Sequence, residues 1–232
     1  MDVIRGGAAE LRGEEARHLT RVLRVEPGQC YEISDNTSAW LAEVQEARGE
    51  HVVFRVLQPV ESTPLPVRIT LFAAIIKFDR FEWIVEKATE LGVERIVPVD
   101  TARVEKGLFE ASRKRSARWA RIARESSQQS RRVQVPEISP AVRLAKAIAE
   151  PFDHRFFLEE TAAPALLTTI PQERDTADRA GLLLGPEGGW TNAERELAAA
   201  AGWQAVSLSP QVLRAETAAA AAVAIVLNAW MR

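Results

Sequence analysis

The chain has 232 residues, of which 47% are hydrophobic and 27% charged, and a net charge of −2 at pH 7. This composition is typical of one or two globular domains with an ample core. A single cysteine, Cys30, excludes a disulfide framework and a cysteine-based zinc site. Because the histidines, His18, His51 and His154, lie far apart, we expect no metal site. We also expect a cytoplasmic protein with no membrane partner, because no run of 18 apolar residues and no signal-peptide pattern occurs.

Residues 1–62 are predicted to form a small β-rich domain. A helical pattern covers residues 13–23 and carries Arg17 and Arg21, with Arg24 at its exit. Two interpretations of these arginines remain open: an RNA-binding surface, or a solvated helix face that neighbouring glutamates partly neutralise. Alternating apolar residues then predict strands at residues 30–35, 40–45 and 51–58.

A linker is expected from Pro59 to Pro66, a stretch that contains three prolines. Beyond it, residues 69–76 form a continuous apolar run, which is typical of a strand inside a parallel sheet. We therefore place the domain boundaries at residues 1–62 and 67–232.

The first strand-helix-strand unit of the second domain indicates its fold class. A helix is predicted over residues 81–91, capped by Asp79 and closed by Gly92, and residues 93–99 form the next strand. Consecutive strands joined by a helix lie parallel, so the unit predicts an α/β domain with a parallel sheet. The buried face of the helix is expected to carry Trp83, Ile84, Ala88 and Leu91.

A strongly basic segment follows the second strand. A long helix is expected over residues 109–129, with Trp119, Ile122 and Ala123 as its buried stripe. Residues 113–132 contain eight cations and one acid, a pattern that is either a solvated face or a contact with phosphates. The density of cations favours phosphate contact, because each cation that neutralises a phosphate releases counterions. The predicted RNA contacts on this helix are Lys114, Arg118 and Arg121.

A glycine-rich loop follows the buried strand predicted at residues 180–184. The three glycines of Gly185-Pro-Glu-Gly-Gly189 let the backbone approach a ligand. Thr191 and Glu194 have the spacing of a capping box, which opens a helix that Gly202 closes. The loop lacks the G-x-G-x-x-G pattern of dinucleotide-binding folds and the lysine of a P-loop, so a merely structural turn remains an alternative.

A second loop strengthens the prediction of a ligand site. Residues 205–208 are predicted as a buried strand, and an apolar helix at residues 215–230 is expected to be covered on all sides. Arg214 and Glu216 stand at the head of this helix, where charges are costly unless they are paired or used. Because both loops leave the same end of strands that we take to be adjacent, we expect a ligand between them.

Together these motifs resemble the RsmE family of SPOUT methyltransferases. Two segments are specific in combination, Leu184–Gly189 and Leu213–Ala218. The chain departs from the family pattern at Ser209, Gln211 and Arg131, where glycine, arginine and glycine are usual. The other matching segments are His18–Arg24, Lys87–Gly92, Ile96–Pro98, Arg103, Trp119–Gln129 and Val135–Pro136.

The resemblance implies a PUA-like RNA-binding domain followed by a SPOUT domain whose C-terminal segment forms a deep trefoil knot. It implies S-adenosylmethionine as the methyl donor, a homodimer, and methylation of N3 of a uridine in 16S rRNA of the small ribosomal subunit, near the decoding centre. The alternatives are methylation of a different rRNA or tRNA nucleotide, and a non-catalytic RNA-binding assembly factor.

The resemblance also implies roles for residues of the two loops. A carboxylate, Glu216 or Glu187, would accept the N3 proton, and for Glu216 a charge that balances the helix dipole is the alternative. An arginine would stabilise negative charge on the uracil oxygens, and the candidates are Arg103, Arg132 and Arg214. The residues expected to hold the donor are Leu184, Gly185, Pro186, Glu187, Gly188, Gly189, Leu208, Ser209 and Leu213.

Overall fold

The computed structural model describes residues 3–5, 7–61, 64–175 and 177–231, and it divides the chain into two compact units, residues 1–64 and 65–232. Residues 62 and 63 of the expected linker, and the terminal residues 1 and 232 of the two expected domains, lie outside the described residues. Each unit has a hydrophobic core of its own.

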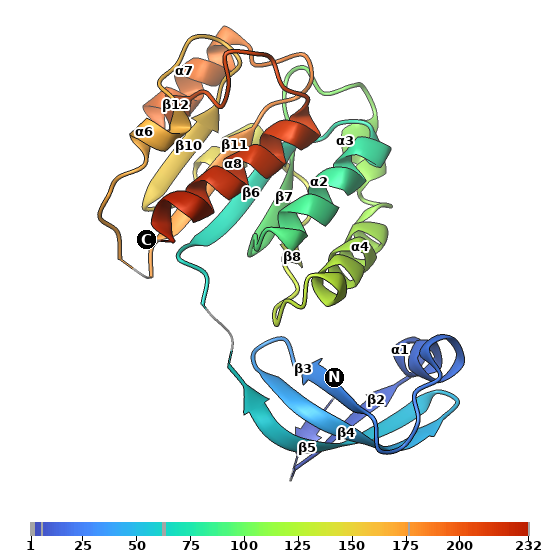
Figure 1. Ribbon diagram of the computed structural model, residues 1–232. Helices are drawn as coiled ribbons and strands as arrows, with labels where there is room; N and C mark the ends of the chain where they lie inside the picture. The colour runs from blue at the N-terminus through green and yellow to red at the C-terminus, as the bar shows by residue number, and fades with distance from the viewer. Residues whose placement is uncertain (1–2, 6, 62–63, 176, 232) are drawn as a thin grey trace. The chain divides into compact units, whose positions relative to one another are not determined.

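The first unit contains an antiparallel sheet in the order β1-β2-β5-β4-β3 (Figure 1). The three predicted strands are confirmed, but the pattern misses β1, which has three residues, and β2, which buries only Ala9 and Leu11. The linker begins later than expected, because Pro59 belongs to β5, where it lies beyond the end of β2 and opposite Trp40 of β4. The strands are β1 (Val3–Arg5), β2 (Ala8–Arg12), β3 (Cys30–Ser34), β4 (Ala39–Arg48) and β5 (His51–Val60).

The helical segment of the first unit has two parts. The helix α1 (Glu14–His18) continues as η1 (Leu19–Leu23), a π-helical turn that ends at Arg24 in a left-handed conformation with φ of 51°. The segment is therefore helical as predicted, although its second half is not α-helical. Turns of this kind are rare and frequently mark functional sites.

The second unit contains the predicted parallel sheet, in the order β12-β10-β11-β6-β7-β8, with β9 also paired to β7. Its central strands are buried on both faces: in β6, Leu71 faces one core and Phe72 faces the other. The strands are β6 (Arg68–Ala74), β7 (Arg95–Asp100), β8 (Glu137–Ile138), β9 (Val142–Arg143), β10 (His154–Leu158), β11 (Arg179–Leu184) and β12 (Gln204–Val206).

Helices cover both faces of this sheet (Figure 1). One face carries α2 (Phe78–Glu90), α4 (Ser116–Gln129), α6 (Leu166–Thr169) and α8 (Ala215–Trp230). The other face carries α5 (Leu144–Ile148) and α7 (Asn192–Ala200), which pack with Phe152 and Trp203.

The long helix expected over residues 109–129 is wrong, because the structure has two helices, α3 (Leu108–Ser112) and α4, with residues 113–115 between them. The hydroxyl of the buried Ser112 donates to the carbonyl of Phe109 at 2.6 Å. Serine side chains that bond the nearby backbone in this way compete with helix propagation. The predicted buried stripe of α4 is confirmed for Trp119 and Ala123, with Ile122 partly buried.

The helix α2 differs from the prediction at its start and on its buried face. Lys77 is the N-cap, so Asp79 lies inside the first turn and does not cap the helix. Trp83 is 56% exposed, because its direction on the helix falls outside the buried stripe of Phe81, Ile84, Val85 and Ala88. The Lys87 ammonium lies 5.3 Å from the centre of the Trp83 ring.

One expectation about the C-terminal segment is wrong, and a second is met on one side of the helix only. The strands β11 and β12 are not adjacent, because β10 lies between them, and β12 is an edge strand with Ala205 exposed. Both strands run parallel to β10, so their loops still leave the same edge of the sheet. Within one chain α8 is covered on one side only: Ala219 and Val223 are buried, whereas Ala221 and Ala224 are partly exposed.

Candidate functional site

A pocket lies at the carboxyl edge of the parallel sheet, where the loops after β10, β11 and β12 meet the start of α8. Its volume is about 90 Å³. Eight of the nine residues predicted to hold a methyl donor line it, all except Gly188. Two sequence-distant segments predicted to form one site therefore meet in one pocket.

The glycines of the loop after β11 differ in what a side chain at each position would contact. A Cβ atom on Gly185 would lie 2.8 Å from Cε2 of Trp190, and one on Gly189 would overlap the Glu160 carboxylate. Gly189 also has φ of 69°, a conformation that favours glycine. A Cβ atom on Gly188 would lie 3.4 Å from Cδ of Arg103, which is an ordinary contact. Neighbours in the same chain therefore account for the glycines at positions 185 and 189.

Trp190 joins the glycine loop to the neighbouring strand. Its indole is buried, and its Nε1 donates to the carbonyl of Leu158 at the end of β10, at 2.9 Å. Its ring lies 4.5 Å from the ring of Phe157, centre to centre. The sequence placed Trp190 after the loop but gave no sign that it forms a wall of the pocket.

Two arginines from other segments of the chain hold the glycine loop. Arg80, in the first turn of α2, pairs with the carboxylate of Glu187. Arg103, which follows β7, donates from its guanidinium to the carbonyl of Gly188. Arg103 was predicted to act at the site, whereas Arg80 was not singled out.

The helix after the glycine loop begins with the predicted capping box. Thr191 Oγ1 accepts from the Glu194 amide at 3.3 Å, and Glu194 Oε2 accepts from the Thr191 amide at 2.8 Å. Gly202 ends this region with φ of 80°, as predicted for a helix stop. The other carboxylate oxygen, Glu194 Oε1, accepts from the amide of Ala102 at 2.8 Å.

The second loop leads directly into α8. Its residue Val212 is 75% exposed, and Arg214 is the exposed N-cap of the helix. Glu216 lies in the first turn, where one carboxylate oxygen, Oε2, is buried and has no hydrogen-bond partner within the described part of the chain. An unpartnered buried carboxylate oxygen is costly, which favours a role for this group.

Two carboxylates at the end of β10, Glu159 and Glu160, also line the pocket and were not predicted as site residues. The side chain of Glu159 is only 4% exposed and accepts two hydrogen bonds from Arg195, at 2.5 and 3.0 Å. Burial raises the pKa of Glu159, but the bonds and charge of Arg195, together with the amides of Glu160 and Thr161, outweigh it, so this pKa lies below its ordinary value. In the sequence, Glu159 and Glu160 directly follow the apolar residues that form β10, and this position is the signal that could have found them.

Arg132 lies away from this pocket. Its guanidinium donates to the carbonyls of Thr89 and Val93 at 2.6 and 3.1 Å. Val93 precedes β7, so this contact is at the amino edge of the sheet, opposite the loops that form the pocket. Burial lowers the pKa of the Arg132 guanidinium. Of the three arginines predicted as catalytic, only Arg103 and Arg214 lie at the pocket's edge of the sheet within one chain.

Comparison with known proteins identifies the family. Residues 63–227 match a sequence model of the RNA methyltransferase domain, and residues 11–57 match one of the RNA methyltransferase PUA domain. The chain is 32% identical to ribosomal RNA small subunit methyltransferase E of Synechocystis sp., covering 90% of this chain and 69% of that protein. It is 31% identical to the protein of the same name from Mycobacterium tuberculosis, covering 97% and 89%.

The chain belongs to the ribosomal RNA small subunit methyltransferase E family. Solved structures agree with this assignment. The family member from Neisseria gonorrhoeae, described as bound to S-adenosyl methionine, is 30% identical, with a TM-score of 0.89 over 99% of this chain and 96% of that one. A methyltransferase from Legionella pneumophila in complex with SAM is 28% identical, with a TM-score of 0.86 over 99% and 95%.

The arginines and the lysine predicted to bind RNA differ in their partners in this methyltransferase E family member. In the first unit, Arg17 pairs with Glu50. On α4, Arg118 makes two hydrogen bonds to Glu82, at 2.5 and 2.7 Å, and Arg121 lies 3.6 Å from Glu125. The remaining members of the set, all exposed and without a side-chain partner in the described residues, are Arg21, Arg24 and Lys114.

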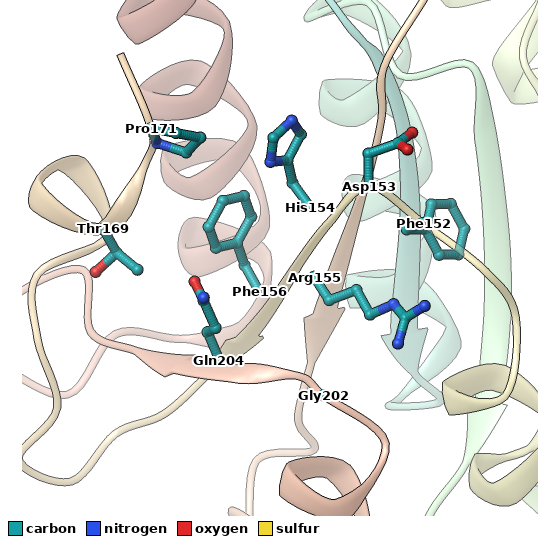
Figure 2. A pocket seen from close by; sticks show the side chains of 9 residues that line it. All are labelled: Phe152, Asp153, His154, Arg155, Phe156, Thr169, Pro171, Gly202 and Gln204. Atoms are coloured by element: carbon teal, nitrogen blue, oxygen red, sulfur yellow. The ribbon is translucent and has the colours of Figure 1, made fainter. Parts of the chain in front are cut away.

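A larger cavity of about 360 Å³ lies at the amino end of β10 (Figure 2). His154 and Phe156 point to one side of the strand and Arg155 to the other (Figure 2). The Arg155 guanidinium donates to the carbonyl of Ala201 at 2.7 Å, and Nε2 of His154 lies 2.8 Å from Oδ2 of Asp178. None of the residues predicted for the methyltransferase site lines this cavity.

Across the described residues, no group of histidine, cysteine, aspartate and glutamate side chains is arranged to hold a metal ion. No helix among them is long and apolar enough to cross a membrane.

Proposed function

We propose that residues 67–232 transfer a methyl group from S-adenosylmethionine to N3 of a uridine in 16S rRNA, near the decoding centre of the small ribosomal subunit. The observation that carries the proposal is the pocket in which the glycine loop, the loop after β12 and the start of α8 meet. Relatives named for methylation of small-subunit rRNA, two of them at 32% and 31% identity, support this substrate.

The residues of the pocket fit the proposed donor. Apolar side chains such as Leu184 and Leu213 suit its adenosine, and the carboxylate of Glu160 suits its positive charge. At about 90 Å³ the pocket is smaller than the ~300–1,000 Å³ usual for small-molecule sites. Val212, which lines this pocket, is 75% exposed.

Bound S-adenosylmethionine supplies a methyl group activated by a sulfonium charge. The methyl carbon forms a bond to N3 of the uridine as the bond between that carbon and the sulfur breaks. N3 gives up its proton to a base. Glu216 suits this role because one of its oxygens is buried without a partner in the described residues, whereas the Glu187 carboxylate is already held by Arg80. Arg103 and Arg214 stabilise charge on the uracil oxygens.

The first unit supplies RNA affinity in this proposal. Residues 1–62 act as a PUA-like domain in which Arg21 and Arg24 contact phosphates. In the second unit, Lys114 contacts phosphate directly, while Arg118 and Arg121 first exchange their glutamate partners for RNA. Since the substrate is ribosomal RNA, the protein acts in the cytoplasm.

We propose further that the protein is a homodimer and that its C-terminal segment forms a trefoil knot. The partly exposed side of α8 carries the small or apolar residues Ala221, Ala224 and Ile225, together with the exposed polar residues Thr217 and Asn228. Trp83 is exposed on α2, which packs beside α8 on the same face of the sheet (Figure 1). An exposed aromatic next to small residues is typical of a subunit interface.

The proposal is tested by incubating the purified protein with S-adenosylmethionine and either 16S rRNA or small ribosomal subunits, followed by nucleoside analysis. The expected product is 3-methyluridine at one position. A different methylated nucleoside, or none, would replace this function with one of the alternatives.

A further inference from the structure

Glu194 makes more hydrogen bonds than the start of a helix requires. It is 7% exposed and lies in the first turn of α7. Its Oε2 accepts from the amide and the hydroxyl of Thr191, at 2.8 and 2.9 Å. The bond from the Thr191 amide belongs to the capping box, which needs only one carboxylate oxygen.

The second oxygen, Glu194 Oε1, reaches a different segment of the chain. It accepts from the amide of Ala102 at 2.8 Å. Ala102 lies in the turn after β7 that is closed by the Val104 amide bonded to the Thr101 carbonyl at 3.2 Å. A buried carboxylate is costly unless hydrogen bonds satisfy it, so this bond couples the turn to α7.

The next residue in this turn is Arg103, which contacts the glycine loop. Its guanidinium donates to the carbonyl of Gly188, and its aliphatic stem lies 3.4 to 4.0 Å from the position that a Cβ atom on Gly188 would take. These contacts and the backbone form a closed ring, which runs from Glu194 through Ala102 and Arg103 to Gly188 and returns along the chain to Thr191 and Glu194. Both loops that the ring joins stand at the carboxyl edge of the sheet, where the pocket lies.

We infer that Glu194 is a positioning residue for methyl transfer, which fixes the turn after β7 so that Arg103 meets the glycine loop. This inference rests on the proposed function and assigns Glu194 no contact with RNA or donor. Loss of the carboxylate frees the turn, and Arg103 then spends less time at the site. A residue that only caps α7 would change the stability of the helix without this effect on Arg103.

The experiment compares Glu194→Met, which removes both acceptors in a side chain of similar length, with Thr191→Ala, which weakens the cap but keeps the bond to Ala102. Hydrogen exchange is measured on the wild-type protein and both variants. We expect Glu194→Met to speed exchange in residues 101–104 by about tenfold or more, and Thr191→Ala to speed it only at the start of α7. Unchanged exchange in residues 101–104 of Glu194→Met would overturn the inference, and this readout does not depend on any activity.

The second measurement is a double-mutant cycle in the single-turnover methylation rate with Arg103→Met. We expect Glu194→Met to be slower by about tenfold or more, and the double variant to be no slower than Arg103→Met alone. Glu194→Gln, which retains one acceptor, should recover part of the rate. If the rate losses of Glu194→Met and Arg103→Met multiply in the double variant, Glu194 has a merely structural role. The same conclusion follows if Thr191→Ala slows methylation as much as Glu194→Met does. A wild-type protein that methylates no RNA would refute the proposed function instead, and the exchange result would still decide the role of Glu194.

Discussion

The indole of Trp190 occupies the space that a side chain on Gly185 would need, because a Cβ atom there would lie 2.8 Å from Trp190 Cε2. The same indole donates to the carbonyl of Leu158. The first glycine of the loop therefore allows a tryptophan to join the ends of β10 and β11 beneath the pocket.

Gly185→Ala should destabilise the protein by about 1–3 kcal/mol, because the added methyl group forces the buried indole out of place. Gly188→Ala is the matched control, since its Cβ would make an ordinary contact at 3.4 Å and its φ is not left-handed. Denaturant unfolding of both variants measures the difference. Equal stability of the two variants would contradict the packing described for Trp190.

Arg132→Met should reduce the free energy of unfolding by about 1–3 kcal/mol, because the carbonyls of Thr89 and Val93 lose their donor. The affinity for S-adenosylmethionine should not change, because this contact lies at the edge of the sheet opposite the pocket. Arg131→Gly is the control, since it removes a neighbouring charge at a residue whose φ of 54° suits glycine. Calorimetric titration that showed lost donor binding by folded Arg132→Met would refute this placement.

Glu216→Gln should slow single-turnover methylation by about 100-fold or more, the range of a general base, while leaving donor binding intact. Glu187→Gln should have a smaller effect on the rate, because that carboxylate serves the ion pair with Arg80. A rapid-quench assay with donor affinity measured separately gives both numbers. Wild-type rates from Glu216→Gln with normal donor affinity would assign its carboxylate to the helix dipole instead.

Glu159 should contribute to loss of stability in acid. Its folded-state pKa lies below its ordinary value, so its contribution is fully present above the unfolded value of about 4.3 and is lost as the pH falls through the folded value. Thermal unfolding of Glu159→Gln should therefore depend less on pH below about pH 4 than that of the wild type. Glu196→Gln, an exposed change on α7, should follow the wild-type curve. If the unfolding temperatures of the wild type and Glu159→Gln change with pH in parallel, Glu159 does not contribute to the loss of stability in acid.

Trp83→Glu should shift the protein from dimer to monomer at micromolar concentration, because a charge would be placed in the proposed interface. Leu197→Glu, which changes an apolar residue that is 45% exposed on the opposite face of the sheet, is the control and should remain dimeric. Sedimentation velocity distinguishes the two states. A monomeric wild type would refute the interface directly.

Local patterns in the sequence were sufficient for several features of the fold. The apolar run before Gly185, the capping box of Thr191 and Glu194 and the helix stop at Gly202 each depend on neighbouring residues, and all three are confirmed. The break between α3 and α4 was missed because a serine hydroxyl can bond either water or the backbone, and burial of Ser112 decides between them.

Features that depend on distant residues could not be predicted in the same way. The position of Arg132 depends on the packing of α4 against the end of α2, and the order of β10, β11 and β12 depends on how the chain crosses the sheet. Glu159 and Glu160 enter the pocket only because β10 lies between the two strands whose loops were taken as neighbours. The resemblance to a family supplied the site's function, which spacing alone did not.

Methyl transfer from labelled S-adenosylmethionine to small ribosomal subunits and to naked 16S rRNA, with the modified nucleotide mapped by mass spectrometry, tests the proposed chemistry most directly. We expect one 3-methyluridine per rRNA near the decoding centre, and a much lower yield from Glu216→Gln. Label at another base, or label in RNA with no 3-methyluridine, would contradict the proposed chemistry even though the fold and the family assignment would stand.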